Sequence, residues 1–252
     1  MLRVENLSVA VEDKLILRNI NLHIAPGEVH VLFGPNGTGK STLLGTVMGF
    51  ERFKVLEGKI YFKGKDITGL PCNERAKLGL GMMIQRPPTI RGLSLRKMVE
   101  ICGAAPAEVE ELAQLMDMEN FLDRSVNEGF SGGELKRAEL LQLMAQKPEL
   151  LLLDEPESGV DVENIALVGK AANRILSDKN HAALIITHLG TVLQYVPATH
   201  AHILYEGRIT CQQDAPGEVL KCIEKDGYSA CACKCCISRC QESQCGGVCL
   251  KG

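Results

Sequence analysis

The most constraining feature of this sequence is a glycine-rich segment between an apolar run and a helical pattern. The run 29–33 is typical of a buried strand, and the letters GPNGTGKST follow it directly. Four residues match the pattern G-x-x-x-x-G-K-[ST], namely Gly34, Gly39, Lys40 and Ser41. A glycine-rich turn that binds nothing is the alternative, but the lysine and serine in register argue against it. The segment therefore predicts an α/β fold with a phosphate-binding loop.

The residue types of this loop suit a nucleotide. Glycines let successive backbone N–H groups, together with the N-terminus of the following helix, surround phosphate oxygens. Lys40 would reach the β- and γ-phosphates, and the Ser41 hydroxyl would bind Mg²⁺. The residues expected to contact the nucleotide are Gly34, Pro35, Asn36, Gly37, Thr38, Gly39, Lys40, Ser41 and Thr42.

A second apolar run ends in two acidic residues. The stretch ELLLLDEPESGVD contains four leucines followed by Asp154 and Glu155. In a chain with a phosphate-binding loop, a carboxylate at a strand end is the expected second Mg²⁺ anchor, here Asp154. Glu155 is placed to orient the attacking water or to accept its proton. The alternative is that both acidic residues are merely solvated charges in a loop. This is less favoured because the chain also contains the phosphate-binding loop.

The stretch FSGGELKRAELLQLMAQKPEL predicts a helix with a special start. Ser131 and Glu134 have the spacing of a capping box, and Pro148 is expected to stop the helix. A well-capped helix is the simplest interpretation. However, two glycines in the first turn cost helix stability, which indicates that the backbone there approaches another group closely.

Two further polar residues follow strand-like runs. Gln85 precedes a Pro-Pro break, and His188 follows the apolar stretch AALIIT. Taken alone, the glutamine is typical of a solvated loop and the histidine of a structural residue. Residues 93–120 between these motifs have mostly helical periodicity.

Composition excludes several classes of function. The chain has 252 residues, 45% of them hydrophobic, which is enough to bury a sizeable core. Its 28 basic and 31 acidic residues give a net charge of -3, so the total implies no nucleic-acid partner. The N-terminus lacks the pattern of a signal peptide, and no apolar run is long enough to cross a bilayer. We therefore expect a cytoplasmic protein without direct membrane insertion.

In order and spacing, these motifs resemble the nucleotide-binding domain of the ATP-binding cassette (ABC) family over residues 1–215. The resemblance implies a P-loop ATPase with a RecA-like core, an N-terminal antiparallel β-subdomain and a helical subdomain at about 86–145. It assigns Gln85 as the Q-loop glutamine, which also helps to hold Mg²⁺, and His188 as the switch histidine. The signature segment corresponds to Ser131, Gly132 and Gly133, and the D-loop to residues 158–161, which end at Asp161.

The family mechanism implies a site shared between two copies. The signature segment of a second chain would close over the γ-phosphate held by the first, so that ATP joins two copies and hydrolysis releases them. The sequence departs from the family at the early aromatic residue on which adenine stacks. The corresponding region offers only Val9, Ala10 and Val11, which leaves the choice of base open.

Three stretches are most similar to the SufC-like branch, the ABC ATPases of SUF iron–sulfur cluster assembly. They are LSVAVEDKLILRNINLHIAPGEVHVLFGPNGTGKST, DEPESGVD and ITHLGTVLQYVPATHAHILYEGRI. This resemblance implies a SufB-like scaffold as partner, in some systems together with SufD. One alternative is the ATP-binding subunit of a membrane transporter. Another is a metal-responsive binding protein whose ATPase gates delivery.

The chain ends in a cysteine-rich segment that the SufC-like pattern lacks. Eight of its 11 cysteines lie in the last 31 residues. After the ABC domain 1–215 we distinguish a helical segment at 216–230 and a cysteine-rich tail at 231–252. A disulfide clasp ranks last among the explanations because a cytoplasm keeps thiols reduced. The spacing names no metal, but an all-thiolate set suits iron–sulfur clusters, zinc or Cu(I), and a redox-sensitive tail without a ligand stays open. The candidate ligands are Cys231, Cys233, Cys235, Cys236, Cys240, Cys245 and Cys249.

Overall fold

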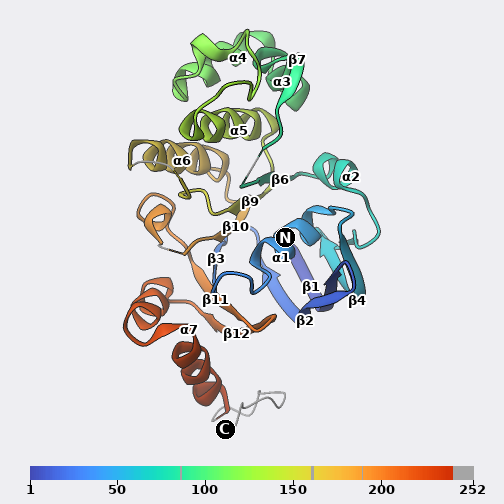
Figure 1. Cartoon of the computed structure of the whole chain (residues 1–252), viewed down its shortest axis with the longest axis vertical. Coiled ribbons are helices and arrows are strands. Elements are labelled where there is room, and N and C mark those ends of the chain that lie inside the picture. Colours follow the sequence, from blue (N-terminus) through green and yellow to red (C-terminus); the bar gives the residue numbers. More distant parts are fainter. Residues whose placement is uncertain (86, 160–161, 189, 241–252) are drawn as a thin grey trace.

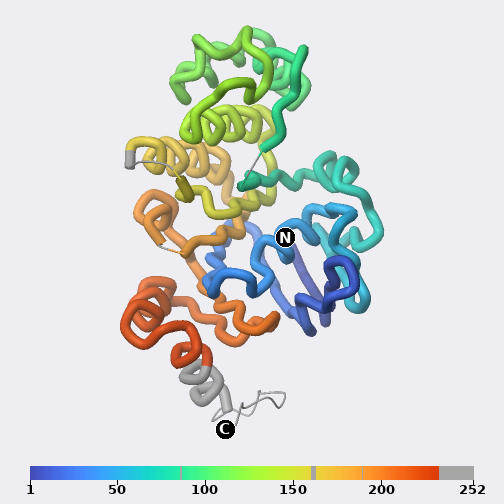
Figure 2. The backbone as a smooth tube through the Cα atoms, viewed as in Figure 1, coloured from blue at the N-terminus to red at the C-terminus, as the bar shows by residue number. Residues whose placement is uncertain are grey.

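The protein consists of a mixed sheet with helices around it, an antiparallel sheet at one side and a helical group at one end (Figure 1). The computed structural model describes residues 1–85, 87–159, 162–188 and 190–240. Figure 2 shows that the N-terminus lies beside the middle of the molecule, whereas the described chain ends at the opposite pole from the helical group.

The antiparallel sheet carries the N-terminal segment. Its strand order is β2-β1-β4-β5, and the strands are β1 (Leu2–Val11), β2 (Lys14–Ile24), β4 (Phe53–Phe62) and β5 (Lys65–Asp66). In β2, Ile20, Leu22 and Ile24 are buried while the residues between them are exposed, which is the alternation expected of a strand with one covered face.

The six-stranded sheet is the centre of the fold. Its order is β12-β11-β3-β10-β9-β6, parallel except for the antiparallel pair β11 and β12. The strands are β3 (Val29–Phe33), β6 (Leu80–Met83), β9 (Leu150–Asp154), β10 (Ala182–Ile186), β11 (His200–Tyr205) and β12 (Arg208–Gln213). The inner strands β9 and β10 are buried along their whole length, as apolar strands covered on both faces are.

The helices flank this sheet and form the end group. They are α1 (Lys40–Met48), α2 (Cys72–Lys77), α3 (Leu95–Cys102), α4 (Pro106–Leu115), α5 (Gly132–Gln146), α6 (Val162–Ile175) and α7 (Pro216–Cys240), with 3₁₀ turns η1 (Glu119–Phe121) and η2 (Thr191–Gln194). A short antiparallel pair of strands, β7 (Ile90–Ser94) and β8 (Ser125–Val126), lies with α3, α4 and α5 in the end group (Figure 1). The predicted helical stretch 93–120 therefore starts as a strand and is broken twice.

These elements confirm the predicted α/β class with an antiparallel β-subdomain and a helical insertion. Two hydrophobic clusters hold them together. One joins α3, α4, α5 and α6 to one face of the central sheet, and the other joins α1 and the antiparallel sheet to strands β9 and β10. Within the described residues, no helix combines the length and the apolar character needed to cross a membrane.

The C-terminal helix differs from the predicted division at residue 230. Helical structure continues to Cys240, and the break lies earlier, at Gly227, where φ is 77°. Cys231 is 2% exposed and packs in a third cluster with Phe33, Ile203 and Val219. The first cysteine of the predicted tail is thus part of the hydrophobic packing against β3 and β11.

Arg75 of α2 connects the end of α1 to the segment 68–70 by hydrogen bonds. It is only 2% exposed, and its guanidinium donates hydrogen bonds of 2.8 Å to the carbonyls of Thr46, Val47, Thr68 and Leu70. Two of these carbonyls belong to the last turn of α1, where C=O groups lack donors from a following turn, although the N–H of Gly49 also donates to Thr46 at 3.1 Å. Arg75 therefore donates to carbonyls at the end of α1, and its positive charge lies at the negative end of the helix dipole.

We expect Arg75→Met to lower the free energy of unfolding by about 3 kcal/mol, because it leaves several buried carbonyls without donors. Denaturant unfolding of the purified protein measures this loss. The matched control is Lys77→Met on the same helix, whose side chain is 70% exposed. The control should change stability by less than about 0.5 kcal/mol, and an equal effect of the two substitutions would contradict the role assigned to Arg75.

Candidate active site

The glycine-rich loop connects the C-terminal end of β3 to the N-terminus of α1. Gly39 precedes the helix with φ 103°, in the left-handed region that glycine adopts readily. A Cβ atom on Gly34 would lie 2.3 Å from the carbonyl oxygen of Leu204, so only glycine fits there. The first turn of α1 contains no acidic side chain, which leaves its N–H groups suited to an anion.

Lys40 is held inside this loop. Its ammonium donates hydrogen bonds to the carbonyls of Gly34 (2.8 Å) and Pro35 (2.9 Å), and the residue is 5% exposed. Burial lowers the pKa of Lys40, while the nearby carboxylates of Glu155 and Asp154 act in the opposite direction. The ammonium group of Lys40 is therefore held inside the glycine-rich loop.

Ser41 and Asp154 meet across the sheet. The Ser41 hydroxyl donates to Oδ1 of Asp154 at 3.1 Å, although the two residues are far apart in the chain. Asp154 is the last residue of β9 and is 5% exposed, and this burial raises its pKa. A hydroxyl and a carboxylate are hard oxygen donors, so this pair fits Mg²⁺.

Two side chains from distant segments of the chain form hydrogen bonds with Glu155. Gln85 donates from Nε2 to Oε2 of Glu155 at 3.0 Å, and His188 Nε2 lies 2.7 Å from Oε1. Each of the two carboxylate oxygens of Glu155 thus has a side-chain partner from another segment. The structure thus brings together all three residues that were predicted to act in catalysis.

The backbone conformation at Glu155 sets the direction of its side chain. Glu155 has φ 49°, an unusual conformation for a residue other than glycine, and its N–H donates to Ile186 at 3.1 Å. Next to it, Glu157 is 8% exposed and accepts a hydrogen bond from the Thr187 hydroxyl, which in turn accepts from the N–H of Gly190. The turn after β9 is therefore tied to the residue that precedes His188.

The signature segment lies apart from the loop of the same chain. Ser131 and Glu134 form the predicted capping box, with hydrogen bonds of 2.7 Å and 3.4 Å between side chains and backbone. Gly132 and Gly133 begin α5, which packs on α6 away from α1 (Figure 1). A Cβ atom on Gly133 would lie 2.7 Å from Asn164 of α6, which explains one of the two glycines. Among the described residues, no hydrogen bond links this segment to the glycine-rich loop, and the predicted contact residue Asp161 lies outside them.

Two charged residues of α5 near this site were missed in the sequence. Lys136 is 5% exposed and its ammonium lies 3.4 Å from the backbone oxygen of Glu155. Glu139 is 8% exposed and accepts a hydrogen bond of 2.7 Å from the N–H of Ile84, next to Gln85. Their spacing of three residues puts them on one face of the helix, beside the apolar stripe, and this was the available signal.

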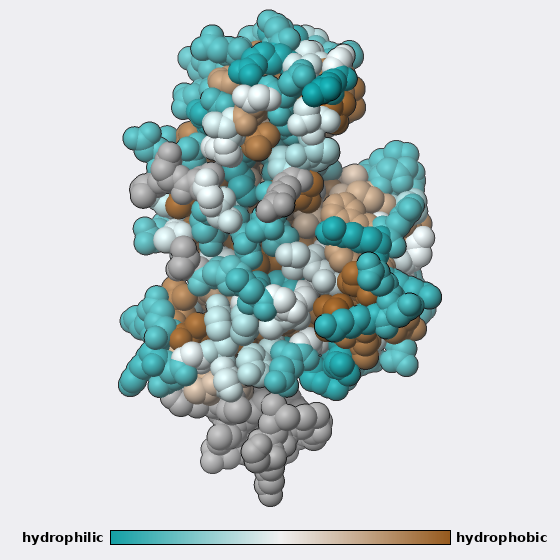
Figure 3. Space-filling model, viewed as in Figure 1, coloured by the Kyte–Doolittle hydropathy of each residue, from teal (hydrophilic) through white to brown (hydrophobic). Residues whose placement is uncertain are grey.

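A cleft of about 890 Å³ opens beside these residues. Its lining includes the polar residues Ser41, Gln85 and Asp154 as well as Phe50 and Cys72. Figure 3 shows hydrophobic residues gathered over α1, α2 and β4 on this side of the molecule. The cleft therefore joins the predicted magnesium ligands to a partly apolar surface.

The chain matches the family model described as "ABC transporter" over residues 17–158. It is 39% identical to the "Probable ATP-dependent transporter SufC" of Escherichia coli over 244 residues, which covers 90% of this chain and 97% of that protein. The chain belongs to the ABC ATPase family. It is also 39% identical to the "Probable ATP-dependent transporter ycf16" of Cyanidium caldarium, with 83% and 88% of the two chains covered.

Solved structures of ABC cassettes have the same fold. The cassette MJ1267 of an ABC transporter superposes with a TM-score of 0.75 at 25% identity, covering 92% of this chain and 98% of the other. As a member of the family, this ABC ATPase hydrolyses ATP and binds it with Mg²⁺. The resemblance to the SufC-like branch is confirmed as well.

The cysteine-rich segment of this ABC ATPase is described only in part. Cys245 and Cys249 lie outside the described residues, as do the side chains of Cys233, Cys235, Cys236 and Cys240. Cys211 is buried in β12 and packs in the same hydrophobic cluster as Cys231.

We expect Glu139→Gln to change how stability depends on pH. Burial raises the pKa of Glu139 to about 7 from an ordinary value of 4.5, so the folded state holds this proton more tightly than the unfolded state does. The stability of the parent protein should therefore fall relative to the variant as pH rises from 4.5 to about 7, by up to about 3 kcal/mol.

Urea unfolding of both proteins across this pH range tests the expectation. The glutamine retains an acceptor for the N–H of Ile84, so the variant should fold. Parallel pH profiles for the two proteins would show that Glu139 titrates normally and that its burial has no consequence for the link between α5 and Gln85.

Proposed function

We propose that this protein is the ATPase that drives iron–sulfur cluster assembly on a SufB-like scaffold in the cytoplasm. The observation that carries the ATPase part is the Glu155 carboxylate held between Gln85 and His188 beside the glycine-rich loop. The assembly role is supported by 39% identity to SufC across nearly the whole chain. SufD is the second expected partner.

The residues of one chain would divide the chemistry as follows. Residues 34–42 would bind the phosphates of ATP, and Lys40 would hold the β- and γ-phosphates. Ser41, Asp154 and Gln85 would hold Mg²⁺, which neutralises charge on the phosphate oxygens. Glu155 would orient a water molecule toward the γ-phosphate and accept its proton, while His188 fixes the carboxylate.

The second half of the site would come from another copy of the chain. Ser131, Gly132 and Gly133 begin a well-capped helix whose N–H groups suit the γ-phosphate, but they lie apart from the loop of their own chain. Asp161 would contact the partner copy from the segment that follows Glu157. The dimeric structure of the bacterial ABC transporter cassette MJ0796, 22% identical with a TM-score of 0.74, has the same fold. We infer that ATP joins two copies transiently and that hydrolysis separates them.

The scaffold would bind at the cleft that ends in Gln85. The partly apolar walls around Phe50 and Cys72 suit a protein partner, and Gln85 contacts both the cleft and Glu155. A movement of the scaffold would therefore reach the catalytic carboxylate through one side chain. In the proposed division into an ABC domain 1–215 with a helical subdomain at about 86–145, the residues that line this cleft all lie outside the helical subdomain, and Gln85 directly precedes it.

The tail 231–252 would add a thiolate site for an iron–sulfur cluster or another thiophilic metal. This part of the proposal rests on the density of cysteines in the sequence and on the relationship to an assembly ATPase. The second candidate function is the ATP-binding subunit of a membrane transporter, which the word "transporter" in the names of several relatives favours.

The experiment that separates these candidates is an anaerobic affinity purification of the full chain from its native cell. Soluble and membrane fractions are kept apart, and the copurifying chains are identified by mass spectrometry. A soluble SufB-like chain supports the proposal, whereas a multi-spanning membrane protein as the main partner supports the transporter.

Glu155→Gln tests the catalytic assignment. We expect ATP to bind with similar affinity while hydrolysis slows by at least about 100-fold, because the amide cannot accept the proton of water. The variant should also accumulate as a dimer with ATP, measured by size-exclusion chromatography with light scattering. Glu157→Gln on the same turn is the control for packing, and an unchanged rate in Glu155→Gln would remove Glu155 from the role of base.

A further inference from the structure

Two histidines and a glutamate gather at the end of β3 that lies away from the glycine-rich loop. His30 and His200 are directly paired in the parallel register of β3 and β11, so their side chains leave the same face of the sheet. Glu28 lies two residues before His30 and therefore on the same side. None of these residues belongs to the ATP site.

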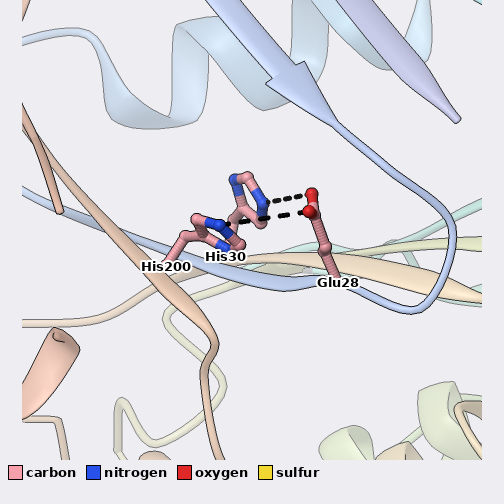
Figure 4. A group of neighbouring side chains, drawn as sticks. All are labelled: Glu28, His30 and His200. Carbon is pink, nitrogen blue, oxygen red and sulfur yellow. Dashed lines mark hydrogen bonds and ion pairs between the residues drawn. The ribbon is translucent and has the colours of Figure 1, made fainter. Parts of the chain in front are cut away.

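The three side chains point toward one another (Figure 4). Nε2 of His30 lies 2.9 Å from one carboxylate oxygen of Glu28, and Nε2 of His200 lies 3.9 Å from the other. One ligand atom from each residue lies within 4.8 Å of the other two. A carboxylate and two imidazole nitrogens thus converge on one small volume.

The remaining nitrogen of each histidine already has a partner. Nδ1 of His30 lies 2.8 Å from Nε2 of His202, and Nδ1 of His200 lies 2.8 Å from the Thr199 hydroxyl. Metal-binding histidines in proteins use one ring nitrogen for the metal and donate from the other to such a partner. These contacts orient both rings so that Nε2 faces Glu28.

Glu28 is also held in place. Its Oε2 accepts a hydrogen bond of 2.6 Å from the N–H of Ala25. The backbone therefore fixes this carboxylate, a ligand type that divalent metal ions accept, beside the two imidazoles.

The site is closed on one side and open on the other. His30 is 2% exposed, whereas Glu28 and His200 are 29% and 30% exposed. A further carboxylate, Asp214, lies 3.4 Å from Nε2 of His200 and is 90% exposed. An ion can therefore enter from solvent, and Asp214 or a water molecule can complete its coordination.

We propose that Glu28, His30 and His200 bind a divalent first-row transition-metal ion, for which zinc is the best match. Two imidazoles and one carboxylate with an open fourth position form a known type of zinc site. Ligand atoms of a tetrahedral zinc ion lie about 3.3 Å apart, given bonds of about 2.0 Å. Metal binding would therefore require His30 and Glu28, now 2.9 Å apart, to separate slightly and His200, now 3.9 Å from Glu28, to approach.

This site would connect the two ends of the molecule. It clamps β3, which leads into the ATP-binding loop, to β11, whose hairpin partner β12 leads into α7 and the cysteine-rich segment. The proposal is independent of the scaffold and of the tail, because none of its ligands belongs to either.

The test uses the full-length chain with serine in place of six tail cysteines, so that thiolates do not compete for metal. The replaced residues are Cys233, Cys235, Cys236, Cys240, Cys245 and Cys249. The protein is titrated with Co²⁺, a spectroscopic substitute for zinc, and then with Zn²⁺ in competition. We expect one Co²⁺ per chain with the visible bands of a nitrogen and oxygen site, without sulfur charge-transfer bands, and displacement by Zn²⁺.

His200→Ala and Glu28→Gln should each weaken Co²⁺ binding by at least about tenfold, since even the loss of an outer partner costs 10- to 100-fold. The matched control is His23→Ala, an exposed histidine of β2, which should bind as the parent does. Circular dichroism melting without metal confirms that each variant folds. Equal binding in the parent and both variants, or spectra of sulfur ligation only, would overturn the proposal.

Discussion

The carboxylate of Glu155 is the point on which the active site depends. It accepts hydrogen bonds from Gln85 after β6 and from His188 after β10, and its own residue follows β9. These three strands are parallel neighbours or near neighbours, so their carboxyl ends meet at one edge of the sheet. The side chain of Glu155 therefore links the turn after β9 to the segments that carry Gln85 and His188.

Burial gives the neighbouring charges their properties. Lys40, Lys136, Glu139 and Asp154 are each less than 9% exposed, and they lie around the end of β9. Removing charges from water costs free energy unless opposite charges and hydrogen bonds compensate, which is why both signs occur together here. The same packing ties α5, the helix that begins with the signature segment, to the residue before Gln85. Glu139 therefore links the signature helix to the segment that carries Gln85.

The parallel pairing of β3 and β11 matters at the other end of these strands, away from the ATP site. It aligns His30 with His200 and brings both to Glu28, although His200 is distant in the chain. No spacing pattern in the sequence joins these residues. The same strand β3 thus carries the phosphate-binding loop at one end and the proposed metal site at the other, with a clamp to the C-terminal hairpin between them.

Local patterns were enough to predict the glycine-rich loop, the buried strand that ends at Asp154 and the capping box at Ser131, because each depends on neighbours within a few residues. The order and spacing of these motifs also identified the family, and through it Gln85 and His188 as site residues. The contacts of these two side chains with Glu155, the burial of Lys136 and Glu139 beside them and the packing of Cys231 against β3 became visible only in the folded chain. Strand order and helix packing bring together residues whose separation along the chain carries no local signal.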